Sequence, residues 1–292
     1  METIRLKQTL TDKQSAKLKG TFLTKKHWDK LINFDCDAYD ENTGKLLFRF
    51  RKNAIPFDVL KSGYLAFKDS ITLNGGRGIA AGGYHKQIRK DGTEGKFDVS
   101  PKVESGNVGF MDARPGGGTV AVCRKTAFAK EHFDRYRDGI PFVQYVDKKY
   151  KELCPEHYAK QRAIADGTNK NYIIDNTAFT TVTVNRNFQT AVHKDAGDYP
   201  EGFGNLIIYR EGDYKNGYFV LPEYGVALDL HNTDILFVDV HRWHGNTDFT
   251  DCSDDWLRIT FVMYYREYMY KCKSPSGELE RIKMDQTGFL RL

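Results

Sequence analysis

The residues of this sequence best suited to chemistry are a histidine and an aspartate two positions apart, His193 and Asp195. They follow a β-branched stretch, and residues i and i+2 of an extended segment point to the same side. One imidazole and one carboxylate can therefore bind the same metal ion. A third ligand would come from His241 or His244, which follow another strand-like stretch. Two histidines and one carboxylate on one face form the facial triad of non-haem Fe(II) oxygenases.

An arginine and a threonine further along the chain, Arg258 and Thr260, also share one side of an extended segment. A guanidinium offers a two-pronged donor to a carboxylate, which suits the distal carboxylate of 2-oxoglutarate. A single histidine is more often structural than catalytic, but the whole set in this order is rare and predicts a metal site. Cys252 lies nearby and is not needed, because a soft thiolate favours other metals.

The elements that must position these residues are mostly strands. Short β-branched or aromatic runs, separated by turn residues, predict an antiparallel sandwich or barrel, and they lie at 179–184, 205–209, 218–221, 226–230, 234–240 and 257–265. Upstream, apolar residues at helical intervals in 126–165 predict one or two amphipathic helices, broken near 139–141. Helices followed by strands indicate an α+β fold in which helices buttress one face of a sheet.

Composition excludes several classes of protein. The chain has 292 residues, of which 40% are hydrophobic, and no apolar run approaches the roughly 20 residues that a membrane span needs. The first residues contain no apolar stretch of the kind found in secretory signals. The five cysteines are scattered and form no CxxC pair, so we expect no disulfide framework and a reducing, intracellular environment.

The positive charge is concentrated near the N-terminus. Residues 1–30 contain eight basic and three acidic side chains, which accounts for the entire net charge of +5. The remainder of the chain is electrically balanced. This segment could be a solvated, partly mobile tail, or an arm that neutralises nucleic-acid phosphates, and the two interpretations have equal weight.

Two glycine-rich stretches, 74–83 and 114–118, precede the predicted helices. Neither has the GxGxxG spacing of a nucleotide-binding turn after a strand. We therefore interpret both as loops that close over a pocket.

At these residues the sequence resembles the Fe(II)/2-oxoglutarate dioxygenases, and within them the TET/JBP family of DNA 5-methylpyrimidine hydroxylases. The matching stretches are 179–188, 193–198, 243–247 and 258–264, with upstream blocks at 105–112 and 123–128. The resemblance implies a double-stranded β-helix, or jelly-roll, core buttressed by helices. On this basis we expect a basic N-terminal extension and lead-in at 1–70, and a single catalytic domain at 71–292.

The resemblance also assigns the metal and cosubstrate ligands. His193, Asp195 and His244 would bind Fe(II), and His244 is preferred to His241 because the family places the second histidine just before a glycine or another small residue. Arg258 would bind the carboxylate of 2-oxoglutarate with help from Thr260. The loop residue Arg124 is a lesser candidate for the same cosubstrate. Ascorbate would act as a reductant, or would replace 2-oxoglutarate in an unusual member.

Base recognition would fall to four further residues. In the family, the position of Asp198 bonds the target base, and the position of Tyr264 stacks on it. Many members have a histidine where this chain has Arg266. Asn107 could also reach the base. The alternatives are a turn-capping role for Asp198, core packing for Tyr264 and a loop hydrogen bond for Asn107.

The function implied is oxidation of the 5-methyl group of 5-methylcytosine in DNA to 5-hydroxymethylcytosine or beyond, with the base flipped out of the duplex. Asp198 and Arg266 could equally serve thymine, which stays open as the target. A hydroxylase acting on a protein or small molecule stays open too, as does a non-enzymatic jelly roll that binds nucleic acid. We expect a monomer whose partner is DNA with a methylated pyrimidine, acting in a eukaryotic nucleus or in bacterial or viral cytoplasm, with no membrane partner.

Overall fold

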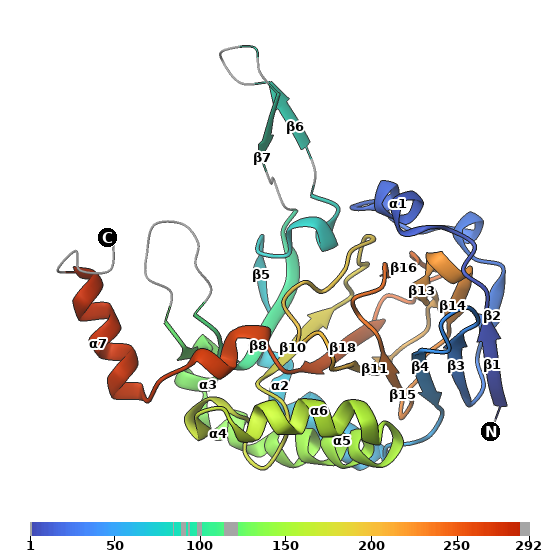
Figure 1. Cartoon of the computed structure of the whole chain (residues 1–292). Helices are drawn as coiled ribbons and strands as arrows, with labels where there is room; N and C mark the ends of the chain where they lie inside the picture. Colours follow the sequence, from blue (N-terminus) through green and yellow to red (C-terminus); the bar gives the residue numbers. More distant parts are fainter. Residues whose placement is uncertain are drawn as a thin grey trace.

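The computed structural model describes residues 2–83, 85–88, 92, 94–97, 101–113 and 122–286. The glycine-rich stretch predicted at 114–118 lies outside these residues. Figure 1 shows a large sheet with helices beneath it and a smaller group of strands beside and above it. Among the described residues, no helix is both long enough and apolar enough to cross a bilayer.

The large sheet contains ten strands. Nine of them run in the order β1-β3-β4-β15-β11-β18-β10-β8-β5, and β9 pairs with β8. Their bounds are β1 (Glu2–Leu6), β3 (Cys36–Asp40), β4 (Leu46–Arg51), β15 (Ile235–Val238), β11 (Gly204–Glu211), β18 (Leu257–Tyr264), β10 (Thr181–Arg186), β8 (Val103–Met111), β5 (Thr72–Asn74) and β9 (Arg124–Lys125). All neighbours are antiparallel except β1 and β3.

A second sheet has the order β16-β13-β14-β2. Its strands are β16 (Gly245–Asn246), β13 (Phe219–Leu221), β14 (Val226–Leu228) and β2 (Lys30–Ile32). Between β10 and β18 the chain crosses repeatedly from one sheet to the other, which is the winding of a jelly roll. The predicted α+β fold with a jelly-roll core is therefore confirmed.

Two small strand pairs lie outside these sheets. They are β12 (Lys215–Asn216) with β17 (Phe249–Thr250), and β6 (His85–Ile88) with β7 (Glu94–Phe97). The pair β6–β7 projects from the body of the molecule in Figure 1.

Most helices lie beneath the large sheet (Figure 1). Their bounds are α1 (Asp12–Ser15), α2 (Phe57–Phe67), α3 (Ala127–Glu131), α4 (Phe133–Asp138), α5 (Ile140–Leu153), α6 (Pro155–Asp166) and α7 (Pro275–Gln286). The break predicted near 139–141 is present, because Gly139 ends α4 and Pro141 lies in the first turn of α5. A Cβ atom on Gly139 would lie 2.2 Å from the Phe67 ring, so this turn needs glycine. The region forms four helices rather than one or two.

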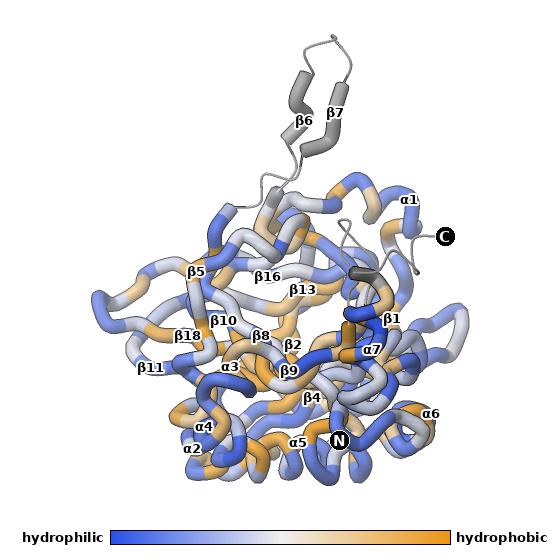
Figure 2. The backbone as a smooth tube through the Cα atoms, turned by 90° about the vertical axis from the view of Figure 1, so that its left-hand side faces the viewer, coloured by the Kyte–Doolittle hydropathy of each residue, from blue (hydrophilic) through white to orange (hydrophobic). Residues whose placement is uncertain are grey.

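The face of the large sheet that covers the helices is apolar, and β18 shows this. Its residues Ile259, Phe261 and Met263 belong to the core cluster that includes Phe142 and Val146 of α5. The alternate residues of β18 face the space between the two sheets, as the two-residue period of a strand requires. Apolar chain, orange in Figure 2, accordingly gathers in the interior and along α5. The helices thus hold the sheet from below and leave its upper face free to build a site.

The domain boundary at residue 70 stays a prediction, and several strands before it join the large sheet. Strands β1, β3 and β4 belong to the same sheet as the jelly-roll strands, with β4 paired to β15. Apolar side chains cause this, because Phe48 and Phe50 of β4 are fully buried between the sheets. Strands β1, β3 and β4 therefore belong to the same sheet as the strands of the predicted catalytic domain.

The basic N-terminal segment is also held against the body. Leu23 is fully buried, in a cluster with Val192 and Trp243. The amide of Gly20 donates to the carbonyl of Val192, and the amide of Val192 donates to the carbonyl of Thr21. The interpretation as a mobile tail is wrong for this segment, since one buried leucine and a strand-like backbone pairing fix it in place.

Two of the cysteines form a disulfide, contrary to the expectation from the sequence. Cys123 and Cys272 are bonded although 149 residues separate them. No local spacing motif links cysteines that are so far apart, so only the fold brings them together. The other three, Cys36, Cys154 and Cys252, are free.

Replacing Leu23 with alanine is expected to lower the free energy of unfolding by about 2–5 kcal/mol, because a fully buried leucine would leave a cavity. Urea unfolding followed by fluorescence measures this. Lys26→Ala alters an exposed residue of the same segment and should change stability by less than about 0.5 kcal/mol. Equal, small effects of the two substitutions would show that the segment is not packed as described.

Candidate active site

Two histidines are brought together by their own backbones. The amide of His193 donates to the carbonyl of His244 at 2.9 Å, and the amide of His244 donates to the carbonyl of His193 at 3.0 Å. This antiparallel pair joins two segments far apart in the sequence. Gly245 makes the approach possible, since a Cβ atom there would lie 2.9 Å from the carbonyl oxygen of Thr190.

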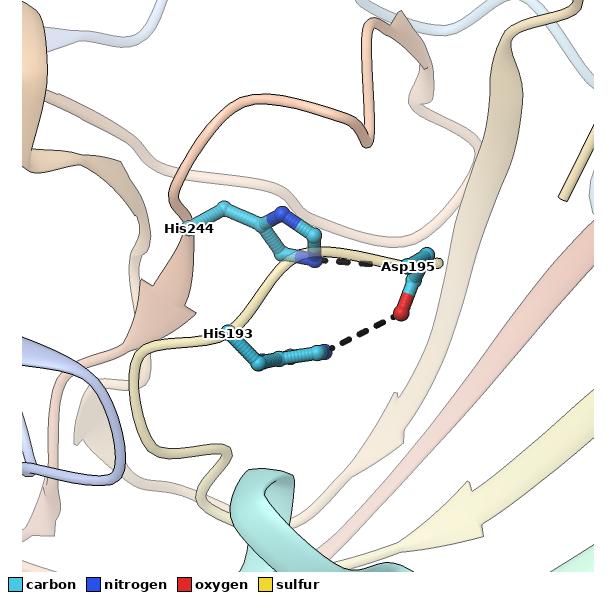
Figure 3. A group of neighbouring side chains, drawn as sticks. All are labelled: His193, Asp195 and His244. Atoms are coloured by element: carbon cyan, nitrogen blue, oxygen red, sulfur yellow. Dashed lines mark ion pairs between the residues drawn. The ribbon is translucent and has the colours of Figure 1, made fainter. Parts of the chain in front are cut away.

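Asp195 completes a compact set of three ligand groups with these histidines (Figure 3). The Nε2 atom of His193 lies 3.3 Å from Oδ1 of Asp195, and Nε2 of His244 lies 3.7 Å from Oδ2. One donor atom from each residue falls within 4.8 Å of the other two. The amide of Asp195 donates to the carbonyl of Val240, which fixes the aspartate beside the segment that leads to His244.

The outer nitrogens of both rings are held by backbone carbonyls. Nδ1 of His193 lies 2.7 Å from the carbonyl oxygen of Ala191, and Nδ1 of His244 lies 2.9 Å from that of Arg242. When both rings are neutral, as metal binding requires, a proton on each Nδ1 satisfies these contacts and leaves each Nε2 lone pair directed at the shared space. Metal-binding histidines are commonly oriented in this way. Two imidazoles and one carboxylate with free coordination positions suit Fe(II).

The charges of the three groups are strongly coupled. Burial lowers the pKa of His244 to about 4, with a further contribution from the charge of His193, so this ring stays neutral and able to bind a metal. Burial is the largest influence on Asp195 and opposes its ionisation, but the hydrogen bond and charge of His193 outweigh it and lower the pKa of the carboxyl. The carboxylate is therefore ionised, as a metal ligand must be.

A buried arginine lies on the wall of the same cavity. Arg258 is 3% exposed, and one of its Nη atoms donates to the hydroxyl of Thr260 at 2.5 Å. Its Nε has no hydrogen-bond partner, and no acidic side chain of the described residues pairs with it. Burial lowers the pKa of this guanidinium. A buried cation without a counter-ion is costly, and a carboxylate from a bound molecule would relieve that cost.

These groups line one cavity of about 680 Å³. The predicted base-contacting residues Asn107, Asp198, Tyr264 and Arg266 all line it as well. The hydroxyl of Tyr264 lies 3.3 Å from that of Thr183 and 3.3 Å from an Nη of Arg266. The side-chain oxygen of Asn107 accepts a hydrogen bond from Thr183. The structure thus gathers the metal set, the arginine–threonine pair and these four residues around one space.

Two residues considered for the site lie apart from its centre. His241 bonds Asp239 through Nδ1 and approaches the carbonyl of Asp198 through Nε2, so it does not face the three-residue set. It lies in a turn after β15, rather than at the end of a longer strand as predicted. Arg124 is exposed on β9, donates to the carbonyl of Val122 and does not line the cavity. A role for Arg124 with the cosubstrate therefore has no structural support.

One cavity residue that the sequence pattern missed is Arg77. Its Nε donates to the hydroxyl of Ser105 at 2.6 Å, and it has no acidic partner among the described residues. Its positive charge helps to lower the pKa of Asp195. Arg77 lies in the first glycine-rich stretch, which does line the cavity as predicted. The sequence did offer one signal for Arg77, because it is a single arginine within a loop that is predicted to close over a pocket.

The N-terminal segment forms part of the site's outer wall. Val192, the residue immediately before His193, accepts a hydrogen bond from the amide of Gly20 and donates one to the carbonyl of Thr21. On the far side, Leu23 forms a bridge with Thr247, three residues after His244. The segment therefore supports both strands that carry the histidines, and Lys19 lines the cavity itself.

The chain is similar to a defined group of proteins. The family described as the oxygenase domain of the 2OGFeDO superfamily (Tet_JBP) matches residues 109–267. Thymine dioxygenase JBP1 of Trypanosoma brucei brucei is 36% identical over 170 residues, which are 58% of this chain and 19% of that protein. Bifunctional helicase and thymine dioxygenase JBP2 of Trypanosoma cruzi is 29% identical over 271 residues, which are 92% of this chain and 23% of that protein. The chain thus spans about a fifth of the length of these relatives.

Solved structures show the same fold. The structure of NgTET1 in complex with 5mC DNA matches with a TM-score of 0.57 and 14% identity, over 87% of each chain. At this level of identity the likeness concerns the architecture rather than the substrate.

Replacing either His193 or His244 with alanine should raise the dissociation constant for Fe(II) or Co(II) by more than about 100-fold, because losing a ligand costs more than losing a supporting hydrogen bond. Anaerobic titration calorimetry measures this, with circular dichroism to confirm folding. His241→Ala should bind the metal nearly as wild type does. If His241→Ala lost the metal while His244→Ala kept it, the ligand assignment would be wrong.

Proposed function

Because the chain belongs to the TET/JBP oxygenase family of the 2OGFeDO superfamily, we propose that it oxidises the 5-methyl group of thymine in DNA to a hydroxymethyl group. The observation that carries this proposal is the metal set and the unpaired arginine in one cavity, together with relatives named thymine dioxygenases at 36% identity.

In this proposal Fe(II) is held by His193, Asp195 and His244. The two Nε2 atoms and the carboxylate supply one face of ligands and leave the opposite face to other molecules. Arg258 and Thr260 bind the distal carboxylate of 2-oxoglutarate, which supplies the counter-ion that Arg258 lacks. When bound, Fe(II) and 2-oxoglutarate supply the oxidising power, with O₂, for hydroxylation of a C–H bond. The protein contributes position and exclusion of water.

The base is held by residues on the other side of the cavity. Tyr264 is 8% exposed and offers an aromatic ring to stack on. Asp198 offers an acceptor and Arg266 offers donors, and the two are paired through their backbones. A base inside a duplex cannot reach a cavity with such walls, so the nucleotide must leave the stack. Asn107 and Thr183 lie beside the same ring.

The kinds of hydrogen-bonding group in the cavity do not choose between thymine and 5-methylcytosine, and the comparisons favour thymine. The donors and acceptors of Asp198 and Arg266 can be matched by either base. The relatives at 36% identity are named for thymine, whereas the 5mC complex shares only 14% identity. We therefore propose thymine in place of the 5-methylcytosine expected from the sequence.

The basic N-terminal segment supplies contacts to the DNA backbone in this proposal. Lys13 and Lys17 are exposed, and Lys19 lines the cavity. Figure 1 shows α1, which lies within this segment, on the side of the molecule away from α5. Positive charge near the cavity would neutralise phosphates flanking a flipped nucleotide. Deleting the segment would not test this cleanly, because Leu23 would be lost from the core with it.

Incubation with duplex DNA containing both bases, Fe(II), 2-oxoglutarate and ascorbate should convert thymine to 5-hydroxymethyluracil. Mass spectrometry of digested nucleosides scores thymine and 5-methylcytosine products separately. Arg258→Met should lose most activity, because the cosubstrate carboxylate loses its buried partner. Arg137→Met removes an exposed arginine of α4 and should have no effect.

Oxidation of 5-methylcytosine alone would overturn the choice of thymine. Oxidation of neither base, with succinate formed from some other substrate, would overturn the DNA proposal and favour a protein or small-molecule hydroxylase.

Substituting glutamine for both Lys13 and Lys17 should weaken DNA binding and reduce the slope of log K against log[salt], by about 0.9 for each phosphate that is no longer neutralised. Fluorescence anisotropy at several salt concentrations measures this. The matched control replaces Lys148 and Lys151, which are exposed on α5 beneath the sheet. Equal salt slopes for the two double variants would show that the basic N-terminal segment does not contact DNA phosphates.

A further inference from the structure

A buried ion pair closes one wall of the cavity beside Tyr264. Nε of Arg266 donates to Oδ1 of Asp112 at 2.8 Å, and the two side chains are 12% and 1% exposed. Burying two charges costs free energy that their attraction often does not recover. A buried pair at the edge of a binding cavity therefore suggests that it serves orientation rather than stability.

Three segments converge on this pair. Asp112 directly follows β8, and its neighbour Met111 lines the cavity. Arg266 follows β18, and its amide donates to the hydroxyl of Thr180 at 2.9 Å. Its backbone pairs with that of Asp198. The backbone of Arg266 is thus fixed at two points, and the carboxylate of Asp112 fixes its guanidinium at Nε.

The donors of Arg266 can be counted. A guanidinium has five N–H donors and no acceptor. Nε is used by Asp112, and one Nη faces the hydroxyl of Tyr264 at 3.3 Å. Among the described residues, nothing accepts from the other Nη. That nitrogen belongs to a side chain that lines the cavity, so it is available to an acceptor on a bound molecule.

We propose that Asp112 is a positioning residue for base selection, which holds Arg266 so that its second Nη donates to the carbonyl oxygen at position 4 of the flipped pyrimidine. This inference rests on the proposed function. A donor held in one direction can donate to a carbonyl oxygen at position 4 of the ring, but it would face the donors of an amine at that position, and burying an unsatisfied polar group is costly. Thymine carries a carbonyl at position 4 where 5-methylcytosine carries an amine, so a donor fixed toward that position favours thymine.

Asp112→Asn keeps the shape of the side chain and removes its charge. It should raise the KM for thymine-containing DNA by about tenfold, in line with the loss of one oriented hydrogen bond to a charged group, while kcat changes much less. The preference for thymine over 5-methylcytosine should fall with it. The Fe(II) dissociation constant should not change, since Asp112 bonds Arg266 rather than a metal ligand.

Glu104→Gln is the matched control. Glu104 lies on β8, the strand that leads to Asp112, and pairs with Arg186, but both side chains are more than one-third exposed and neither lines the cavity. Its substitution should leave KM unchanged. The double variant Asp112→Asn with Arg266→Gln should have the KM of Arg266→Gln alone, because Asp112 acts through that arginine. Additive effects of the two substitutions would overturn the proposal.

A binding measurement keeps this test independent of turnover. Anaerobic anisotropy compares an oligonucleotide carrying thymine with one carrying an abasic nucleotide at the same position. Wild type should prefer thymine, and Asp112→Asn should lose most of that preference. If wild type discriminates and Asp112→Asn discriminates equally, the positioning role is wrong. If wild type binds both equally, the proposed base pocket itself is wrong, and the role of Asp112 with it.

Discussion

The site depends on one short stretch of backbone pairing, the two reciprocal hydrogen bonds between His193 and His244. Because paired residues in neighbouring antiparallel strands present their side chains to the same face, this contact alone places both imidazoles over one space. Gly245 permits the close approach, and the carbonyls of Ala191 and Arg242 set the direction of each ring. The large sheet, the helices beneath it and the N-terminal segment all hold these two strands in register.

Around that contact the cavity is electrically asymmetric. The carboxylate of Asp195 lies among positive charge, with Arg77 and Arg258 both lacking acidic partners among the described residues. Arg266 differs, since Asp112 neutralises it. Two arginines are thus left to attract anions, while the third is held as a directed donor. This division separates the groups suited to a cosubstrate from those suited to a neutral base.

The sequence pattern predicted the parts of the site that lie on long, regular elements. The two-residue period of 257–265 put Arg258, Thr260 and Tyr264 on one face, and β18 has this arrangement. The choice of His244 over His241 depended on the family resemblance, because both follow the same strand. Arg77 lies in an irregular loop, where no residue periodicity predicts the direction of a side chain. Leu23 lies in a lysine-rich segment of the sequence, so its burial could not be predicted. The pairing of Cys123 with Cys272 depends on the fold alone.

The pairing of β4 with β15 has a consequence for how the protein is made. A ribosome produces β4 long before β15, and the large sheet cannot close until both exist. Until then Phe48 and Phe50 lack the cover that they have in the folded protein, so the nascent chain exposes apolar surface at least until β15 has been made. Sheets built from such distant partners form slowly and are prone to aggregate on the way. The protein should therefore depend on chaperones more than a helical protein of equal length does.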